Sequence, residues 1–182
     1  MGLTGCLIGS RLINFFFYRG ERIGRFGKPF KIWKFRTMCY SAETLGGFSV
    51  SETDDRVTRL GKYLRKWKID EFPQLLNVLA GQMSLVGPRP EVKHYIDQLP
   101  EDARKTILSV KPGFTDYASI KWRNEGEVLA KADDPEAYYR DVIRPDKTKL
   151  QIQYVKDKSL WIDLKLIIST VKWLGLDFLK KA

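Results

Sequence analysis

The chain has 182 residues, of which 43% are hydrophobic and 13% aromatic, which suits one domain with its own core and excludes a disordered chain. The net charge is +10, so the partner is expected to be anionic: a nucleic acid, a lipid surface or a phosphorylated substrate. Two cysteines, Cys6 and Cys39, make no disulfide framework. A single histidine, His94, argues against a zinc site.

The N-terminal segment, Leu3 to Tyr18, is mostly apolar but includes Arg11 and Asn14. It is shorter than the roughly 20 apolar residues of a membrane-spanning helix, and it lacks the basic region and cleavage site of a secretory signal. Three interpretations stay open: a buried core element, a re-entrant or interfacial membrane segment, or the stump of a longer helix.

Residues 19–36 are basic and interrupted by glycine, and the alternation within 29–36 predicts a short strand. The small, polar residues 38–53 predict a loop. Two amphipathic helices are predicted over 57–67 and 69–79, with Asp70 as the N-cap of the second.

Farther along the chain, a helix is predicted over 101–109 and a strand over 114–122. Asp134 and Pro135 open another helix, which Pro145 is expected to interrupt.

The last segment, 159–182, predicts a strongly amphipathic helix. Its polar side carries lysine and serine, two tryptophans lie at 161 and 173, and its broad apolar stripe is formed by Leu160, Trp161, Leu164, Ile167, Ile168, Val171, Leu174 and Leu176. Such a helix either packs on the core or lies in a membrane interface, and both interpretations stay open.

Asp70 and Glu71 are candidate catalytic residues because two adjacent acids stand at the start of a helix. An acid there is usually a cap worth about 1 kcal/mol, but a carboxylate can also attack phosphorus to form an acyl phosphate. Mg²⁺ bridging a diphosphate would reduce the repulsion between the anions, and Glu71 is the nearest candidate ligand for it.

Arg89 stands between Pro88 and Pro90, and its planar guanidinium suits either phosphate oxygens or a structural salt bridge. Lys34 and Arg36 either add positive charge for a phosphate or belong to a solvated strand face. Trp122 can stack a base and Arg123 can pair with phosphate, although a buried tryptophan beside a surface arginine is equally plausible.

Taken together and in order, these residues closely resemble the bacterial sugar transferases, the monotopic phosphoglycosyl transferases. The resemblance rests on the segments 22–24, 27–38, 55–61, 64–65, Asp70 to Pro90 and 111–115. It implies a compact, mostly helical α/β fold with a small sheet, resting on the membrane through amphipathic surface helices.

The resemblance also implies a reaction. Asp70 would be a covalent nucleophile that attacks the β-phosphate of a UDP-sugar, releases UMP and passes the phospho-sugar to polyprenyl phosphate, with undecaprenyl phosphate as the default. Glu71 would hold Mg²⁺ or assist the acceptor, and Arg89 would bind phosphate. The implied place is the cytoplasmic face of a bacterial inner membrane, where surface glycoconjugates such as capsule and O-antigen begin.

Residues 1–18 are expected to be a residual membrane segment and 19–182 the catalytic domain. The family's re-entrant helix is longer and is often broken by a Ser-Pro pair, whereas no proline precedes Pro29 here, so most of that anchor is expected to be missing. The alternative function is a non-catalytic basic protein that binds the membrane surface. A nucleic-acid binder ranks last because no recognition motif supports it, and the sequence leaves a homo-oligomer open.

Overall fold

The computed structural model describes residues 15–39 and 55–181. Most of the predicted N-terminal membrane segment and nearly all of the predicted loop over 38–53 lie outside these residues. The described chain is mainly helical with short strands, which confirms the predicted fold class.

The strands form three two-stranded sheets. β1 (Phe17–Tyr18) pairs with β4 (Lys34–Phe35) and β2 (Glu21–Ile23) with β3 (Pro29–Lys31), both antiparallel, whereas β5 (Ser84–Val86) and β6 (Gly113–Thr115) are parallel. The prediction of one strand over 29–36 is therefore wrong. The backbone N–H of Trp33 donates to Asn77 Oδ1 at 2.9 Å instead of to a neighbouring strand, so the chain leaves one sheet and enters another.

Two helices and a 3-10 segment follow in the described part of the chain from residue 55 on: α2 (Arg59–Lys66), η3 (Ile69–Gln74) and α3 (Leu75–Leu79). The prediction that Asp70 is an N-cap is wrong. The residue before η3 that takes the capping position is Lys68, whose left-handed backbone (φ 55°, ψ 19°) turns the chain out of α2 and places Asp70 inside the 3-10 segment. Few non-glycine residues adopt this conformation.

The next helices are α4 (Lys93–Asp97) and α5 (Glu101–Leu108), the second of which confirms the predicted helix over 101–109. The predicted strand over 114–122 is wrong beyond β6, because Asp116 Oδ1 accepts a hydrogen bond from the Ser119 N–H at 2.7 Å and caps α6 (Tyr117–Lys121). α7 (Glu125–Leu129) follows at once.

Asp134 caps α8 (Pro135–Tyr138), as the sequence predicts a helix start there. A π-helical segment, η4 (Tyr139–Ile143), then joins α8 to α9 (Arg144–Asp157), with Pro145 in the first turn of α9. The chain stays helical at Pro145, because a proline in the first turn of a helix removes no helical hydrogen bond. In place of the expected interruption, the helix changes from π to α between Ile143 and Arg144.

The last helix, α10 (Leu160–Lys181), confirms the predicted C-terminal helix. One side packs inward: Leu166 is buried, Ile162 and Ile167 pack against the same core cluster, and Tyr154 of α9 donates to Asp163 at 2.8 Å. The other side is exposed and apolar, with Leu160, Trp161, Leu164, Ile168 and Val171. No helix of the described residues combines the length and the hydropathy that a membrane crossing requires.

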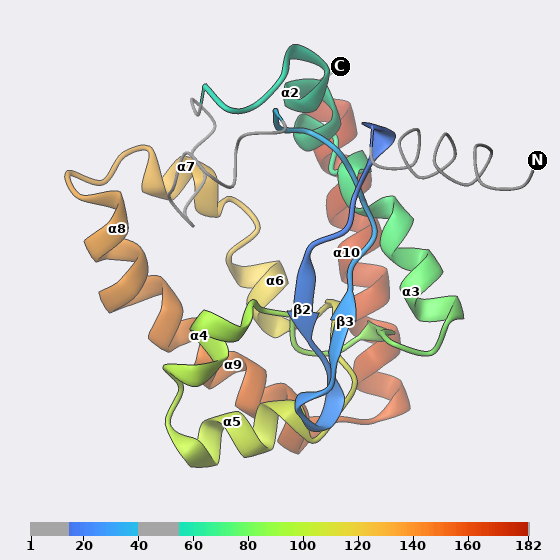
Figure 1. Cartoon of the computed structure of the whole chain (residues 1–182), viewed down its shortest axis with the longest axis vertical. Helices are drawn as coiled ribbons and strands as arrows, with labels where there is room; N and C mark the ends of the chain where they lie inside the picture. The colour runs from blue at the N-terminus through green and yellow to red at the C-terminus, as the bar shows by residue number, and fades with distance from the viewer. Residues whose placement is uncertain (1–14, 40–54, 182) are drawn as a thin grey trace, which may run out of the picture.

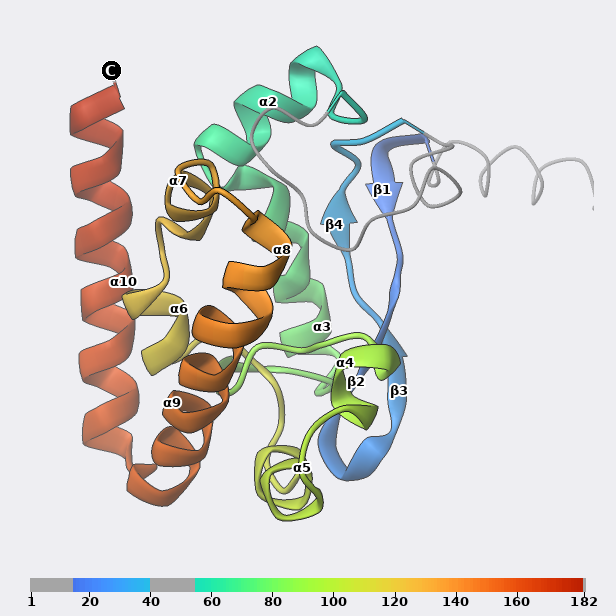
Figure 2. The same ribbon diagram turned by 90° about the vertical axis from the view of Figure 1, so that its left-hand side faces the viewer.

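Figure 2 shows the β2–β3 hairpin on one side of the molecule and α10 on the opposite side, with α6 and α9 between them, and in Figure 1 the hairpin lies in front of α10. Both β5 and β6 contact α10. At the centre, β5 and β6 approach very closely. A Cβ added to Gly113 would lie 2.0 Å from the Gly87 nitrogen, so only glycine allows this contact. The contact fixes the start of the loop after β5 against the first residue of β6.

Candidate active site

Asp70 lies in η3 next to the basic strand β4, since η3 and β4 pack together. Its side chain is only 9% exposed. Among the described residues it accepts no hydrogen bond, but it is close enough to Lys34, Arg65 and Arg89 for their charges to act on its carboxylate. Asp70 is therefore a nearly buried acid facing several cations.

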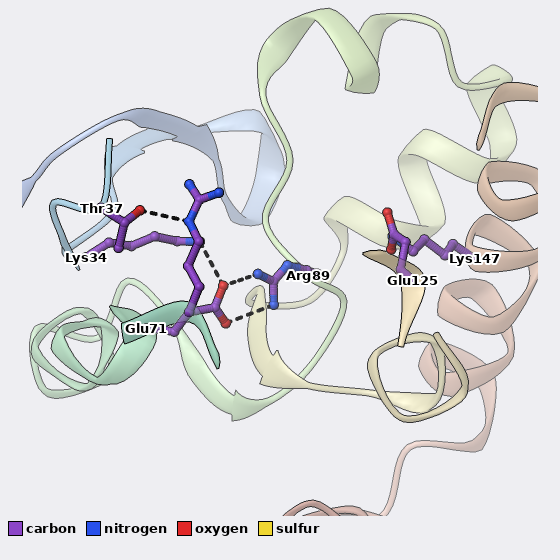
Figure 3. A network of polar contacts seen from close by, with 7 residues as sticks. Lys34, Thr37, Glu71, Arg89, Glu125 and Lys147 are labelled. Atoms are coloured by element: carbon purple, nitrogen blue, oxygen red, sulfur yellow. Dashed lines mark hydrogen bonds and ion pairs between the residues drawn. The ribbon is translucent and has the colours of Figure 1, made fainter. Parts of the chain in front are cut away.

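Glu71 is bound by two of these cations (Figure 3). Lys34 Nζ donates to Glu71 Oε1 at 2.8 Å, and the guanidinium of Arg89 donates to both carboxylate oxygens, with Nη1 3.1 Å from Oε2. The Glu71 side chain is 14% exposed. The structural salt bridge of Arg89 is thus present, and its partner is the neighbour of the candidate nucleophile.

Asn77 of α3 fixes the strand that carries Lys34. It is fully buried; its amide donates to the Lys31 carbonyl at 2.9 Å and to Gln82 Oε1 at 2.8 Å, and its Oδ1 accepts from Trp33. Lys34 follows directly, so Asn77 sets the position of this lysine relative to η3. No role for Asn77 is predicted from the sequence, although a polar residue among the apolar residues of a short helix is a usable signal.

The pKa values of Asp70 and Glu71 are shifted in opposite directions. Burial raises the pKa of Asp70, the neighbouring Glu71 raises it further, and Lys34, Arg65 and Arg89 oppose the shift. For Glu71, burial also disfavours the charge, but Arg89 and Lys34 outweigh burial and hold the pKa of this carboxyl well below its usual range. Glu71 is thus a permanent anion, and Asp70 is the acid of the pair that gains a proton more readily.

Arg65 was not singled out from the sequence. Its Nε donates to Thr37 Oγ1 at 2.9 Å, which ties α2 to the segment after β4. Lys34, Arg65 and Arg89 come from three separate parts of the chain and all act on Asp70. Their convergence creates a positive environment suited to a phosphate.

A divalent cation also fits this pair of acids, because carboxylate oxygens are the ligands that Mg²⁺ prefers. Asp70 accepts no hydrogen bond from the described residues, whereas both oxygens of Glu71 are already hydrogen-bonded. The described residues contain no cluster of three or more His, Cys, Asp or Glu side chains that would bind a metal without further ligands. Substrate oxygens would have to complete such a site.

The remaining predicted site residues make other contacts. Arg36 follows β4, and its guanidinium donates to the Phe17 carbonyl at 3.4 Å. Trp122 follows α6, and its indole N–H donates to Asp146 in α9 at 2.7 Å. Arg123 is exposed in the turn before α7. In the part of the chain that the structure describes, the contacts that place Trp122 tie it to α9 and not to Asp70 or Glu71.

A second group of charged side chains lies on the far side of Arg89 from Glu71 (Figure 3). Lys147 of α9 donates to Glu125 of α7, and Glu91 and Asp116 lie within range of both Arg89 and Lys147. No individual role is predicted from the sequence for any of these four residues, Glu91, Asp116, Glu125 and Lys147. They are far apart in the chain, and only the fold brings them together.

The model of the family described as bacterial sugar transferase matches residues 4–176. The chain belongs to the bacterial sugar transferase family. The match spans the whole group of Asp70, Glu71, Lys34 and Arg89, as well as the second charged group behind Arg89.

Several curated relatives cover most of this chain. It is 35% identical over 157 residues to the UDP-glucose:undecaprenyl-phosphate glucose-1-phosphate transferase of Escherichia coli, a match that covers 85% of this chain and 31% of the relative. It is 36% identical over 154 residues to the UDP-N-acetylgalactosamine-undecaprenyl-phosphate N-acetylgalactosaminephosphotransferase of Aeromonas hydrophila, covering 84% of this chain and 33% of the relative. The match to EpsL of Bacillus subtilis, named an uncharacterized sugar transferase, is 38% identical over 156 residues and covers 86% of this chain and 68% of the relative. The chain thus spans about a third of the length of the first two relatives.

Proposed function

We propose that this protein is a phosphoglycosyl transferase that moves a sugar 1-phosphate from a UDP-sugar to undecaprenyl phosphate. The observation that supports it most directly is the nearly buried Asp70 facing Lys34, Arg65 and Arg89. The printed names of two family members describe such transfers, from UDP-glucose and from UDP-N-acetylgalactosamine.

In the proposed reaction, an Asp70 carboxylate oxygen bonds to the β-phosphorus of the UDP-sugar. The bond from that phosphorus to the oxygen bridging the two phosphates breaks, and UMP leaves with the bridging oxygen. An oxygen of undecaprenyl phosphate then attacks the same phosphorus and releases the Asp70 carboxylate. Covalent catalysis of this kind divides one difficult transfer into two easier displacements.

The neighbours of Asp70 have distinct roles in this proposal. Arg89 and Lys34 balance Glu71 before the substrate binds, and they turn toward the phosphate oxygens when the diphosphate enters. Asp70 and Glu71 would hold Mg²⁺ together with substrate oxygens, and the ion would neutralise charge on the diphosphate. Burial raises the pKa of Asp70, and the surrounding cations oppose this rise. The cations therefore help to keep the nucleophile ionised.

The proposed location is the cytoplasmic face of a bacterial inner membrane, where the polyprenyl acceptor is held in lipid. The exposed apolar side of α10, with Trp161 among its residues, supports contact with a membrane interface. First steps in the assembly of capsule, exopolysaccharide or O-antigen are the pathway class that such a reaction serves.

UMP release from a panel of UDP-sugars, measured with Mg²⁺ and undecaprenyl phosphate in nanodiscs, tests the proposal. We expect release from at least one UDP-sugar, and we expect both EDTA and Asp70→Asn to abolish it. Binding to vesicles without UMP release from any UDP-sugar would instead support a non-catalytic protein of the membrane surface.

A further inference from the structure

Asp116 is fully buried, and one of its two carboxylate oxygens is unused. Oδ1 caps α6 by accepting from the Ser119 N–H, whereas Oδ2 has no hydrogen-bond partner among the described residues. Capping a helix needs only one oxygen, and serine, asparagine or threonine caps as well without a buried charge. Because an unpaired buried carboxylate oxygen costs free energy, its presence calls for a function beyond the cap.

The topology places Asp116 beside the Arg89 loop. Arg89 follows β5 and Asp116 follows β6, and these two strands are parallel, with Val86 in register with Thr115. The close approach of Gly87, directly after β5, to Gly113, the first residue of β6, fixes the start of the Arg89 loop against β6. Arg89 and Lys147 are accordingly the cations whose charges act on the Asp116 carboxyl.

Of these two cations, Lys147 already has an acidic partner, Glu125, outside the candidate active site. Its ammonium donates to Glu125, and both side chains are largely buried. Arg89 differs, because the acid to which it is hydrogen-bonded, Glu71, belongs to the candidate active site. When a phosphate takes the place of Glu71, the Asp116 carboxylate is a buried anion behind Arg89 with an oxygen to spare.

We propose that Asp116 is a positioning residue, whose carboxylate keeps the Arg89 guanidinium in the site when a diphosphate displaces Glu71. The proposal rests on the phosphate-binding role of Arg89 in the proposed function and adds a residue to it. Burial raises the pKa of Asp116, and the hydrogen bonds from Ser119 and the charges of Arg89 and Lys147 offset this rise in part. The guanidinium still stabilises the Asp116 carboxylate when the diphosphate takes the place of Glu71, and the charges of Glu91 and Glu125 also act on Arg89.

Asp116→Asn tests the proposal, because asparagine keeps the helix cap and the shape but removes the charge. Asp134→Asn is the matched control: Asp134 caps α8 in the same way, accepting from the Ala137 N–H at 2.9 Å, but its side chain is exposed. We expect Asp116→Asn to raise the KM for the UDP-sugar about tenfold, equivalent to about 1.4 kcal/mol, and Asp134→Asn to leave it unchanged. A purely structural role would reduce the folded fraction and therefore the maximal rate, not KM.

Two further measurements separate this proposal from the proposed function. In an Arg89→Lys background, Asp116→Asn should raise KM by clearly less than in the wild type, because it acts through Arg89. Titration with inorganic pyrophosphate without metal needs no turnover, and Asp116→Asn should weaken this binding while Asp134→Asn does not.

If the wild type releases no UMP but this difference in pyrophosphate binding persists, the proposed function fails and the role of Asp116 stands. Equal pyrophosphate affinity of the wild type, Asp116→Asn and Asp134→Asn would overturn the role of Asp116. If Asp116→Asn does not fold, Asp116→Ser, which also caps the helix, takes its place.

Discussion

Arg89 and Glu71 form a two-point ion pair that joins the loop after β5 to η3. Both carboxylate oxygens of Glu71 accept from the guanidinium, and Lys34 adds a third hydrogen bond from β4. The acid next to the candidate nucleophile therefore holds the candidate phosphate-binding cations in place before any substrate arrives. A diphosphate has to compete with Glu71 for them, and this competition underlies most of the predictions below.

Replacing Asp70 with asparagine should abolish UMP release without destabilising the protein. The folded-state pKa of Asp70 is raised, mainly by burial, so the charged aspartate costs stability at pH values above the ordinary aspartate pKa of about 3.9. At neutral pH, Asp70→Asn should therefore melt at the same temperature as the wild type or higher, and the gain should vanish below about pH 3.9. A melting temperature several degrees lower would show that Asp70 has a structural role.

The acid side of the pH–rate profile should move when Lys34 is replaced. Burial and Glu71 raise the pKa of Asp70, and the Lys34 ammonium lowers it. Lys34→Met removes the lowering charge, so the nucleophile becomes protonated at higher pH, and the acid limb of kcat/KM should shift upward. Lys31→Met is the control, because Lys31 is exposed on β3. An unshifted limb in Lys34→Met would contradict the assignment of that limb to Asp70.

Arg89→Lys should lower kcat/KM for the UDP-sugar by about 10- to 100-fold, the range expected when a bidentate contact loses one of its two charge-assisted hydrogen bonds, worth about 1.5–3 kcal/mol. Arg140→Lys is a matched control, since Arg140 also forms a two-point pair, with Asp141, but on the exposed surface. The control should change neither kcat nor KM. Steady-state UMP release measures both variants, and equal activity of Arg89→Lys and the wild type would exclude a bidentate contact to phosphate.

Asn77→Ala should destabilise the fold by about 2–4 kcal/mol, because it removes a fully buried amide and leaves the partly buried Trp33 N–H and Lys31 carbonyl without their partner. Asn124→Ala should change stability little, since Asn124 is exposed and makes no capping hydrogen bond. Urea unfolding compares the two variants. A change below about 0.5 kcal/mol for Asn77→Ala, the range of neutral surface substitutions, would show that Asn77 does not fix β3 and β4.

The structure brings together four of the predicted candidate residues, Asp70, Glu71, Arg89 and Lys34, which lie in short motifs that can be read from the sequence. Prediction from the sequence failed where a tertiary contact decides the local structure. Asn77 removes Trp33 from a strand ladder, and the left-handed backbone of Lys68 places Asp70 inside a 3-10 segment rather than at a cap. Neither the hydrogen bond of Asn77 nor the backbone conformation of Lys68 produces a periodic pattern in the sequence.

The charged residues behind Arg89 were missed for the same reason. Asp116, Glu125 and Lys147 come from three separate elements, which only the parallel pairing of β5 with β6 and the packing of α9 bring together. Asp116 also ended the strand predicted over 114–122, because its cap starts α6 where apolar residues favoured a strand. The C-terminal helix, in contrast, is long and periodic, and its prediction is confirmed.

The exposed apolar side of α10 should bind lipid. Leu164→Glu and Ile168→Glu place charge on exposed apolar positions, so each should weaken cosedimentation with anionic vesicles while leaving the melting temperature unchanged. Ser169→Glu adds the same charge at an exposed polar position of this helix and should have a smaller effect. Equal losses in all three variants would mean that charge alone, and not the apolar side chains, determines binding.

Intact-protein mass spectrometry after incubation with a UDP-sugar and Mg²⁺, in the absence of polyprenyl phosphate, tests the covalent role of Asp70 most directly. The proposed mechanism predicts a mass increase of one phospho-sugar, with UMP in solution, and peptide mapping that places the adduct on the peptide containing Asp70. Addition of undecaprenyl phosphate should remove the adduct, and Asp70→Asn should never acquire it. Transfer of the sugar phosphate by Asp70→Asn at the wild-type rate, with no adduct on either protein, would contradict the mechanism.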